Sequence, residues 1–392
     1  HVFRRRQRQM CIRDSLVLGE DENLLHIYLK IDGDNRATAI LPHSEMGQGA
    51  QTALTQMLAE EMDADWNLMR FEEAPANAEY ANMAVGRGYL FKGIDFPDVV
   101  VPTVDGLMLN LADALGMQIS GGSMCIRTTG QYFLRAAGAS VREMLVKTAS
   151  KAWGVPESEI RTAKSMLHHD SSGRLALYSE FAAAAAEMTP SSTPKLKKTS
   201  QFSIMGHSKP RHDIPSKVDG TAMFAMDVKR PGMVYAAVKR TPVAGGTLRR
   251  VDDNAARAMK GVIDVVKVGP SSAAGLVGTY SAGDTIAVVA DSYWTAEKAL
   301  ASLKLEWNTE GKERVSSESI FEQFDRDITA GVDRANDVAM GDATAAFDSA
   351  ATVLTADYRV PYLAHTCMEP PNATAEVSAD RAEIWVGCQN PL

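Results

Sequence analysis

The feature that most constrains this fold is a glycine-rich loop placed directly before a helical pattern of apolar residues. The loop is Ser44-Glu45-Met46-Gly47-Gln48-Gly49. Apolar residues then recur at helical spacing: Leu54, Met57, Leu58 and Met62. We predict a helix over residues 50–62 whose first turn is this loop. Helix-start amides lack internal partners and suit a phosphate, and glycines allow its close approach. Plain helix punctuation is the alternative.

A second glycine-rich loop, Gly121-Gly122-Ser123, has the same setting. It follows a predicted helix around residues 107–115 and leads into another, which carries Leu134, Val141, Leu145 and Ala149. Gly154 and Pro156 are expected to end that helix. A long anionic cofactor needs several backbone anchors, so the presence of two such loops favours a cofactor of this kind. Two structural turns remain the alternative on physical grounds.

Length and charge narrow the class of partner. A chain of 392 residues, 45% of them hydrophobic, predicts two or three compact units. The net charge of −8 argues against a nucleic acid as the main partner, because phosphate backbones require clustered Lys and Arg.

The cysteines lie far apart, at positions 11, 125, 367 and 388, so no zinc or iron–sulfur cluster is expected. No apolar run reaches the length of a membrane span. Adjacent strand residues point to opposite faces, so His168 and His169 are expected in a turn rather than on a metal.

The remaining patterns predict an α+β fold. A hairpin is expected over residues 27–41, a strand over 68–71 and a Ser/Pro/Lys linker over 191–198. Strands and short helices then alternate up to Trp307, with Ser292 as a helix cap. Residues 353–360 and 384–386 read as two further strands. Residues 1–15 are Arg-rich and resemble translated sequencing adaptor, so they are set aside and any signal peptide is out of view.

Several of these segments together resemble the molybdenum-binding subunit of the xanthine dehydrogenase and aldehyde oxidase superfamily. The resemblance is strongest to the isoquinoline 1-oxidoreductase β-subunit type and covers nearly everything after residue 15. It rests on Glu45-Met46-Gly47-Gln48-Gly49, Gly121-Gly122-Ser123, Lys217-Val218-Asp219-Gly220 with Asp291-Ser292-Tyr293-Trp294, and Met368-Glu369-Pro370 with Gln389.

The resemblance implies a permuted domain order. A molybdopterin-binding domain would occupy residues 16–200, an α/β hammerhead domain 201–310, a linker 311–345 and the start of a second molybdopterin-binding domain 346–392. The chain would then be an N-terminal fragment of the subunit.

The resemblance also implies a cofactor, molybdopterin cytosine dinucleotide, and a division of roles. Gly47, Gln48 and Gly49 would hold one part of the cofactor, and Gly122 and Ser123 another. Gln389 would be catalytic, through a hydrogen bond to a molybdenum oxo ligand. No protein side chain is expected to ligate the metal.

The implied reaction is hydroxylation of an aldehyde or N-heterocyclic aromatic with oxygen from water. Electrons would pass to a separate [2Fe-2S] subunit, with a cytochrome c as a further candidate partner. A bacterial, periplasmic or membrane-associated location is expected.

Two family features differ here. Cys125 and Cys388 stand where the family pattern leads us to expect Ser and Thr, which weakens hydrogen bonding at both positions. In the family, the catalytic base is a glutamate close to the C-terminus of the full subunit, which this chain is not expected to reach. Glu369 is therefore not assigned that role, and this polypeptide alone is expected to be inactive. A non-catalytic scaffold or assembly module of the same fold is the alternative function.

Overall fold

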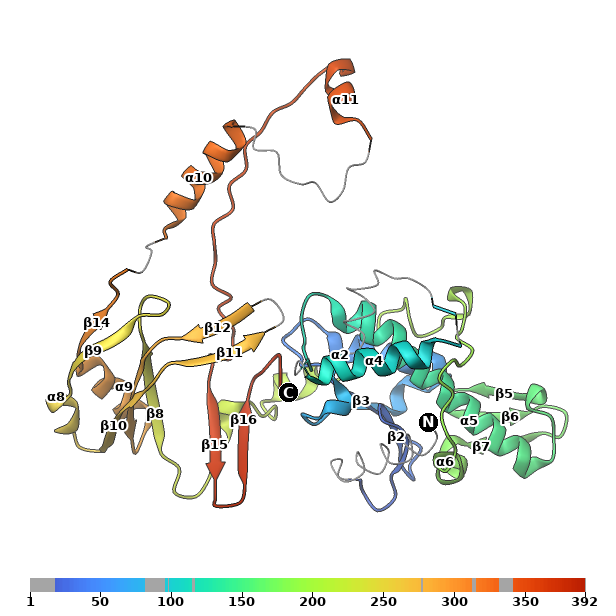
Figure 1. Ribbon diagram of the computed structural model, residues 1–392. Coiled ribbons are helices and arrows are strands. Elements are labelled where there is room, and N and C mark those ends of the chain that lie inside the picture. Colours follow the sequence, from blue (N-terminus) through green and yellow to red (C-terminus); the bar gives the residue numbers. More distant parts are fainter. Residues whose placement is uncertain are drawn as a thin grey trace. The chain divides into compact units, whose positions relative to one another are not determined.

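The computed structural model describes residues 18–81, 96–97, 99–114, 117–275, 278–311, 315–330 and 341–391. The chain divides into two compact units (Figure 1). The first contains residues 1–225 together with 373–392, and the second contains residues 226–372. Residues 201–225, expected in the second domain, and 373–391, expected in a third, therefore both belong to the first unit.

A mixed four-stranded sheet forms the base of the first unit. Its strands follow the order β1 (Asn23–His26), β2 (Leu29–Ile31), β3 (Ala37–Leu41) and β4 (Met69–Glu73). The predicted hairpin is confirmed, because β2 and β3 are antiparallel neighbours. β3 and β4 are parallel, and the predicted helix α2 (Ala50–Met62) connects them. The first glycine loop therefore lies at the carboxyl end of β3, a common location for ligand sites.

The core of the first unit lies between this sheet and two packed helices. α5 (Arg135–Trp153) lies against α2, and Leu54, Leu58, Val141 and Leu145 are buried between them and their neighbours. A Cβ on Gly138 would lie only 2.3 Å from the carbonyl oxygen of Leu58. Glycine is therefore what allows the two helices to approach so closely. Gly154, with φ 67°, ends α5 as predicted.

The other elements of the first unit surround this core. They are the short helices η1 (Trp66–Leu68), η2 (Ala78–Tyr80), η5 (Glu157–Glu159) and η6 (Thr199–Gln201), the helices α4 (Val101–Ala114), α6 (Tyr178–Ala186) and α7 (Ile214–Asp219), the π-helix η4 (Cys125–Leu134), a sheet of β5 (Ile160–Ala163), β6 (Met166–His169) and β7 (Arg174–Leu177), and a hairpin of β15 (Ala373–Val377) and β16 (Ala382–Val386). The π-helix was not predicted. Residues 115–116, where we expected the second helix to end, lie outside the described residues, as do most of residues 82–98.

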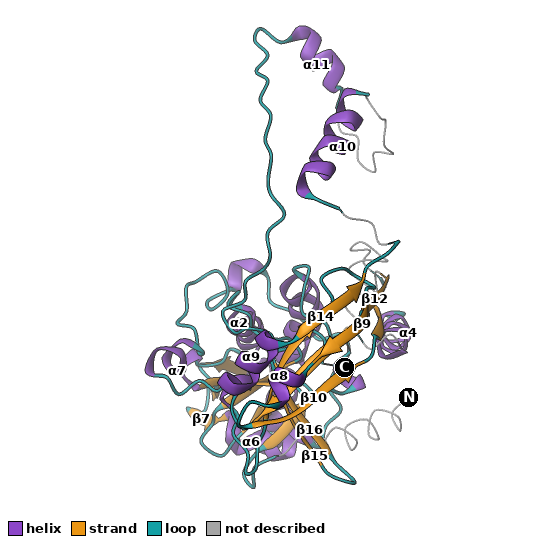
Figure 2. Cartoon of the chain, turned by 90° about the vertical axis from the view of Figure 1, so that its left-hand side faces the viewer, coloured by secondary structure: helices purple, strands orange, loops and turns teal. Residues whose placement is uncertain are grey.

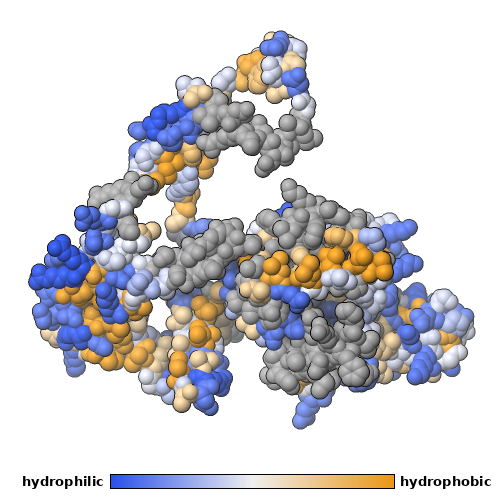
Figure 3. Space-filling model, viewed as in Figure 1, coloured by the Kyte–Doolittle hydropathy of each residue, from blue (hydrophilic) through white to orange (hydrophobic). Residues whose placement is uncertain are grey.

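Two further features of this unit concern exposure: an exposed apolar stretch and a buried histidine. Leu107 and Leu111 on α4 and the preceding Val99 and Val100 are exposed, and Figure 3 shows hydrophobic side chains along this helix. His169 is buried and bonds to Ser172 and Glu159, so it does not lie in the solvated turn we expected.

The second unit contains a three-stranded antiparallel sheet covered by helices. The sheet has the order β10 (Val262–Val268), β13 (Thr285–Ala290), β8 (Tyr235–Arg240). α8 (Asn254–Arg257) and α9 (Tyr293–Ser302) pack against it (Figure 2). Ser292 caps α9 as predicted, its hydroxyl accepting a hydrogen bond from the Thr295 amide. The remaining elements are η7 (Ala225–Asp227) at the boundary of the units, the pairs β9 (Thr247–Asp252) with β14 (Lys304–Asn308) and β11 (Ser271–Gly275) with β12 (Gly278–Ala282), α10 (Ser317–Thr329) and α11 (Ala343–Ser349).

The strand predicted over residues 353–360 is wrong, because the segment forms no regular structure. Leu354, Tyr358 and Val360 are 92%, 88% and 76% exposed. A strand needs a neighbour to satisfy its backbone hydrogen bonds, and the described residues place none beside this segment. Among the described helices, none is both long and apolar enough to cross a membrane.

Candidate functional site

The first glycine loop has a left-handed backbone at both of its glycines. Gly47 has φ 96°, and Gly49, the N-cap of α2, has φ 79°. Residues other than glycine adopt such backbone angles only with strain. Nothing lies within 4 Å of where a Cβ on Gly47 would be. This side of the loop is therefore open to a ligand.

The carboxylate of Glu45 accepts hydrogen bonds from backbone amides at the start of α2. Its Oε1 accepts hydrogen bonds of 2.8 Å from the amides of Gly47 and Gly49, and its Oε2 accepts one of 3.2 Å from Gln51. We expected these helix-start amides to suit a phosphate. In the structure these amides instead donate hydrogen bonds to Glu45, a residue of the loop itself. Ligand recognition is therefore left to the loop's other groups.

Gln48 folds back over its own loop. Its Nε2 donates to the Ser44 carbonyl at 3.0 Å, and its Oε1 accepts from the Met46 amide at 2.5 Å. The side chain is exposed. Because an amide nitrogen carries two hydrogens and its oxygen two lone pairs, Gln48 can brace the loop and still contact a ligand.

The second glycine loop also has an unusual backbone. Gly122 and Ser123 both have φ 59°, and both are exposed. The loop continues directly into the π-helix η4, whose side chain Thr128 donates to the Met124 carbonyl. Single π-helical turns are frequently found at functional sites, and this segment extends over ten residues. Nothing lies within 4 Å of a Cβ position on Gly121, so this loop too has an open side.

A buried histidine joins the two loops. Nε2 of His43 lies 2.8 Å from Oγ1 of Thr129 in the π-helix, and Nδ1 lies 3.3 Å from Oγ of Ser120. That hydroxyl also accepts a 2.7 Å hydrogen bond from the Ser44 amide. Burial lowers the pKa of His43 to about 4, so the ring is neutral at pH 7.

Gln389 reaches the same junction from the far end of the sequence. Its side-chain Nε2 donates to the backbone carbonyl of Ser120 at 2.7 Å, and the backbone carbonyl of Gln389 accepts from the Ser120 amide at 2.7 Å. Beside it, Oγ of Ser44 donates to the Cys388 carbonyl at 2.6 Å. The structure thus brings Gln389 to Ser120 and Ser44, next to the two glycine loops that the sequence singled out.

The two cysteines expected to depart from the family pattern, Cys125 and Cys388, lie in this region. Cys125 is buried at the start of the π-helix, and burial raises the pKa of its thiol. Cys388 is partly exposed, and its sulfur accepts from the Asn390 amide at 3.3 Å. Both are free thiols. The described residues contain no group of three or more His, Cys, Asp or Glu side chains placed to hold a metal ion.

The sequence did not point to three contributors to this site: His43, Ser120 and Arg211. Glu45 lay in the predicted loop, but its contact with the loop's amides was not expected. Arg211 donates to the Gly47 carbonyl at 3.0 Å and lies 3.4 Å from Glu45. Arg211, Asp213 and Lys217 form an ion-paired group. Nothing in the sequence indicates that this group contacts a loop 164 residues away.

Comparison with known proteins gives this geometry a context. Residues 325–392 match the molybdopterin cofactor-binding domain family. The isoquinoline 1-oxidoreductase subunit beta of Brevundimonas diminuta is 30% identical over 93% of this chain and 47% of its own length. A membrane-bound aldehyde dehydrogenase (pyrroloquinoline-quinone) of Gluconacetobacter polyoxogenes is 27% identical over 93% of this chain and 42% of its own length.

Similarity to solved structures is low. Quinoline 2-oxidoreductase from Pseudomonas putida 86 gives a TM-score of 0.30 and 20% identity, over 46% of this chain and 26% of that one. This chain spans about half the length of the curated relatives it matches. The molybdopterin-domain match, together with a relative that aligns with nearly all of this chain, supports a molybdenum-binding subunit of the xanthine dehydrogenase family.

Proposed function

We propose that this chain holds molybdopterin cytosine dinucleotide in a hydroxylase that oxidises an aldehyde or an N-heterocyclic aromatic with oxygen from water. The observation that carries the proposal is the junction at Ser120, which joins the second glycine loop to Ser44 and to Gln389, 269 residues further along the chain. A long cofactor needs anchors from several segments, and this junction provides them. The names of the relatives, an isoquinoline oxidoreductase and an aldehyde dehydrogenase, support the substrate class.

The donor set of the site fits such a cofactor. Gln48, Ser123 and Gln389 are exposed and present amide or hydroxyl groups, which suit phosphate and oxo oxygens. Gly47 and Gly121 leave open space where a side chain would otherwise stand. Gly47, Gln48 and Gly49 would hold one part of the cofactor through the Gln48 side-chain amide, with the two glycines leaving room for its approach, and Gly122 with Ser123 would hold another.

The molybdenum centre supplies two-electron redox chemistry when it is bound. Gln389 would orient an oxygen on the reacting side, because its Nε2 has a second hydrogen besides the one given to Ser120. Neutral His43 would keep the two loops in register without adding charge. Glu45, the carboxylate in the first glycine loop, is engaged by three amides and is not assigned as the catalytic base. We assign that role to none of the described residues.

The partners and location extend the proposal. Electrons would leave through a separate [2Fe-2S] subunit, with a cytochrome c as a further acceptor. We place the protein in the periplasm or at the membrane of a bacterium, in line with the relative whose name describes it as membrane-bound.

Gln48→Ala in the assembled hydroxylase tests the proposal. The variant loses an amide that can donate to an anion, and we expect cofactor affinity to fall about tenfold. The measurements are molybdenum content by mass spectrometry and cytidine monophosphate released by acid hydrolysis, each per subunit. Gln323→Ala, on the exposed helix α10, is the control.

Three results separate the alternatives. Equal loss of molybdenum and nucleotide in Gln48→Ala supports the proposal. Molybdenum without cytidine monophosphate would replace the dinucleotide with another form of the cofactor. No molybdenum in the wild-type assembly would favour the scaffold function instead.

A further inference from the structure

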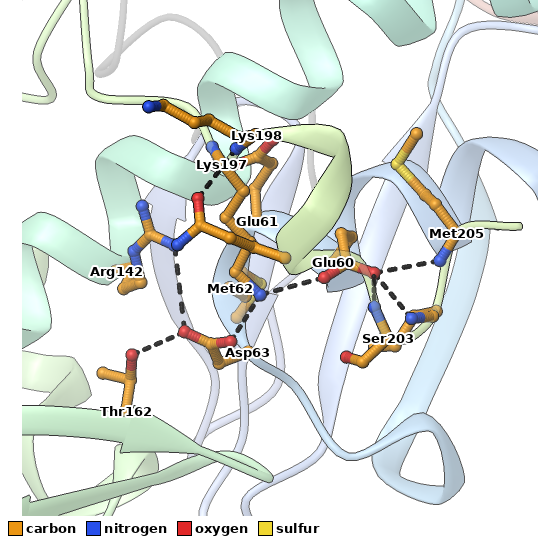
Figure 4. A network of polar contacts seen from close by, with 12 residues as sticks. Glu60, Glu61, Met62, Asp63, Arg142, Thr162, Lys197, Lys198, Ser203 and Met205 are labelled. Atoms are coloured by element: carbon orange, nitrogen blue, oxygen red, sulfur yellow. Dashed lines mark hydrogen bonds and ion pairs between the residues drawn. The ribbon is translucent and has the colours of Figure 1, made fainter.

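A segment between α6 and α7 lies along α2 like a strap. We define the strap as residues 197–213. By composition its beginning reads as a solvated linker, yet Lys197 is only 10% exposed in its side chain. Figure 4 shows where it is anchored, at the C-terminal end of α2. The anchor consists of three carboxylates, two of them fully buried and the third partly exposed.

Glu60 forms the first part of the anchor and is completely buried. One carboxylate oxygen accepts three backbone hydrogen bonds from the strap, 2.9 Å from Ser203, 2.6 Å from Ile204 and 2.9 Å from Met205. The other oxygen pairs with Nζ of Lys197 at 2.9 Å (Figure 4). Burial alone would raise the pKa of Glu60, but the hydrogen bond from Ile204 and the contact with Lys197 hold it below its ordinary value. The carboxylate is therefore charged and fixed.

Glu61 and Asp63 complete the anchor. Glu61, also fully buried, pairs with Arg135 of α5 at 2.7 Å and accepts from the Lys197 amide at 3.0 Å. Asp63 receives a further hydrogen bond from Nζ of Lys197. A buried charge is stable only when it is paired and hydrogen-bonded. Moving the strap away would leave such charges unpaired, so these contacts fix its position.

From the anchor the strap continues toward the N-terminal end of α2. In the middle of the helix, Nε2 of Gln56 donates to the carbonyls of Ile204 and His207, at 3.2 and 3.0 Å. Further along, the ring of His212 lies 4.7 Å from that of Trp66. The strap thus spans the helix from its buried acidic end to the glycine loop.

At the loop, Arg211 completes the path. Its Nη1 donates to the Gly47 carbonyl at 3.0 Å. Its Nε and Nη2 bind Asp213 at 2.9 and 2.6 Å, and Asp213 also pairs with Lys217 at 2.6 Å. Because the guanidinium is planar and its fork on Asp213 sets the plane, the direction of the remaining donor is fixed.

We propose that the strap is a splint for the first glycine loop and that Arg211 is its positioning residue. The amide of Gly47 is held by Glu45 and its carbonyl by Arg211, so both ends of a residue with φ 96° are fixed. The loop is therefore set in shape before any ligand arrives. That the loop's ligand is the molybdenum cofactor rests on the proposed function; the splint itself does not.

Hydrogen–deuterium exchange of the 392-residue chain tests the splint. In Arg211→Ala we expect the amides of residues 46–51 to exchange at least about fivefold faster, as expected for loss of a charge-assisted hydrogen bond. Residues 54–62 of α2 and the urea midpoint should not change. Arg161→Ala, which removes an exposed pair with Asp170, is the matched control and should leave residues 46–51 unchanged.

A conservative variant separates charge from geometry. Arg211→Lys keeps the charge but loses the fork, so only part of the protection should return. Unchanged exchange in Arg211→Ala, or full protection in Arg211→Lys, would overturn the positioning role. Exchange needs no cofactor, so faster exchange in Arg211→Ala with unchanged molybdenum in Gln48→Ala would reject the proposed function and keep the splint. The reverse pair of results would keep the function and reject the splint.

Discussion

At the scale of single residues, His43 shows how a buried polar group can serve as a connector. Its ring is 2% exposed and lies between two hydroxyls, of Thr129 and Ser120. A neutral imidazole has one donor and one acceptor, and a hydroxyl can fill either role, so both contacts are satisfied without charge. Adding a proton would place an unpaired charge inside the protein, which is costly.

This arrangement predicts acid sensitivity centred on one residue. The pKa of His43 is about 4 in the folded chain and about 6.5 when unfolded. Between these values the unfolded state binds the additional proton, so the free energy of unfolding of the first unit should fall as pH falls from 6.5 to 4, by on the order of 3 kcal/mol. Above pH 6.5 the contribution is constant. Urea unfolding at pH 7 and pH 4.5 measures it.

His43→Gln should reduce this pH dependence and lower the stability at pH 7. The exposed His207 provides the control, since His207→Gln should leave the slope of stability against pH unchanged. Equal slopes for wild type and His43→Gln would show that the ring is not the group that responds.

At the scale of elements, one glycine limits the packing of α2 on α5. The Cβ of an alanine at Gly138 would meet a backbone carbonyl, that of Leu58, which cannot rotate away as a side chain can. Gly138→Ala should therefore lower the free energy of unfolding by about 1–3 kcal/mol, or more if the helices must separate. Thermal unfolding measures the change.

Gly106→Ala is the matched helical control for that substitution. Gly106 lies within α4, and nothing occupies the space around its Cβ position. There the change should raise stability by about 0.5–1 kcal/mol, because alanine is the better helix former. A destabilisation of the same size at both positions would show that the close contact with Leu58 is not the cause.

Elements with local signals were predictable from the sequence, and those that depend on distant partners were not. α2 followed from apolar spacing and α9 from the Ser292 cap. The π-helix at residues 125–134 was missed because its hydrogen-bond register departs from the 3.6-residue period on which helix prediction rests. The strand expected over residues 353–360 has the right side chains, but strand formation depends on a neighbour that the pattern cannot supply.

The same distinction applies to the site. The two glycine loops were singled out by their residue pattern, and Gln389 only by the resemblance to a known family. The role of Glu45 could not be read, since a carboxylate beside a glycine loop gives no sign that it will take the loop's own amides. Arg211 and His43 act through contacts that span 164 and 86 residues, and one sequence has no means of indicating such pairs.

At the scale of the whole molecule, the two compact units have separate cores. Leu58 belongs to the core of the first unit and Leu300 to that of the second, and both are buried. Leu58→Ala should destabilise only the first unit and Leu300→Ala only the second, each by about 2–5 kcal/mol. Hydrogen exchange, read separately at α2 and β13, measures the two effects.

Each variant serves as the control for the other. Loss of protection in both units from either substitution alone would show one cooperative structure instead of two.

The contact between Ser120 and Gln389 also has a consequence for biosynthesis. A ribosome adds about 5–20 residues each second, so Ser120 leaves the ribosome many seconds before Gln389 exists. During that interval the second unit, residues 226–372, is made and can fold, while the junction beside the glycine loops lacks its last strand pair. Closing so long a loop is slow compared with forming local structure. The nascent chain therefore passes through a period in which the second unit can be folded while the junction at Ser120 is still incomplete.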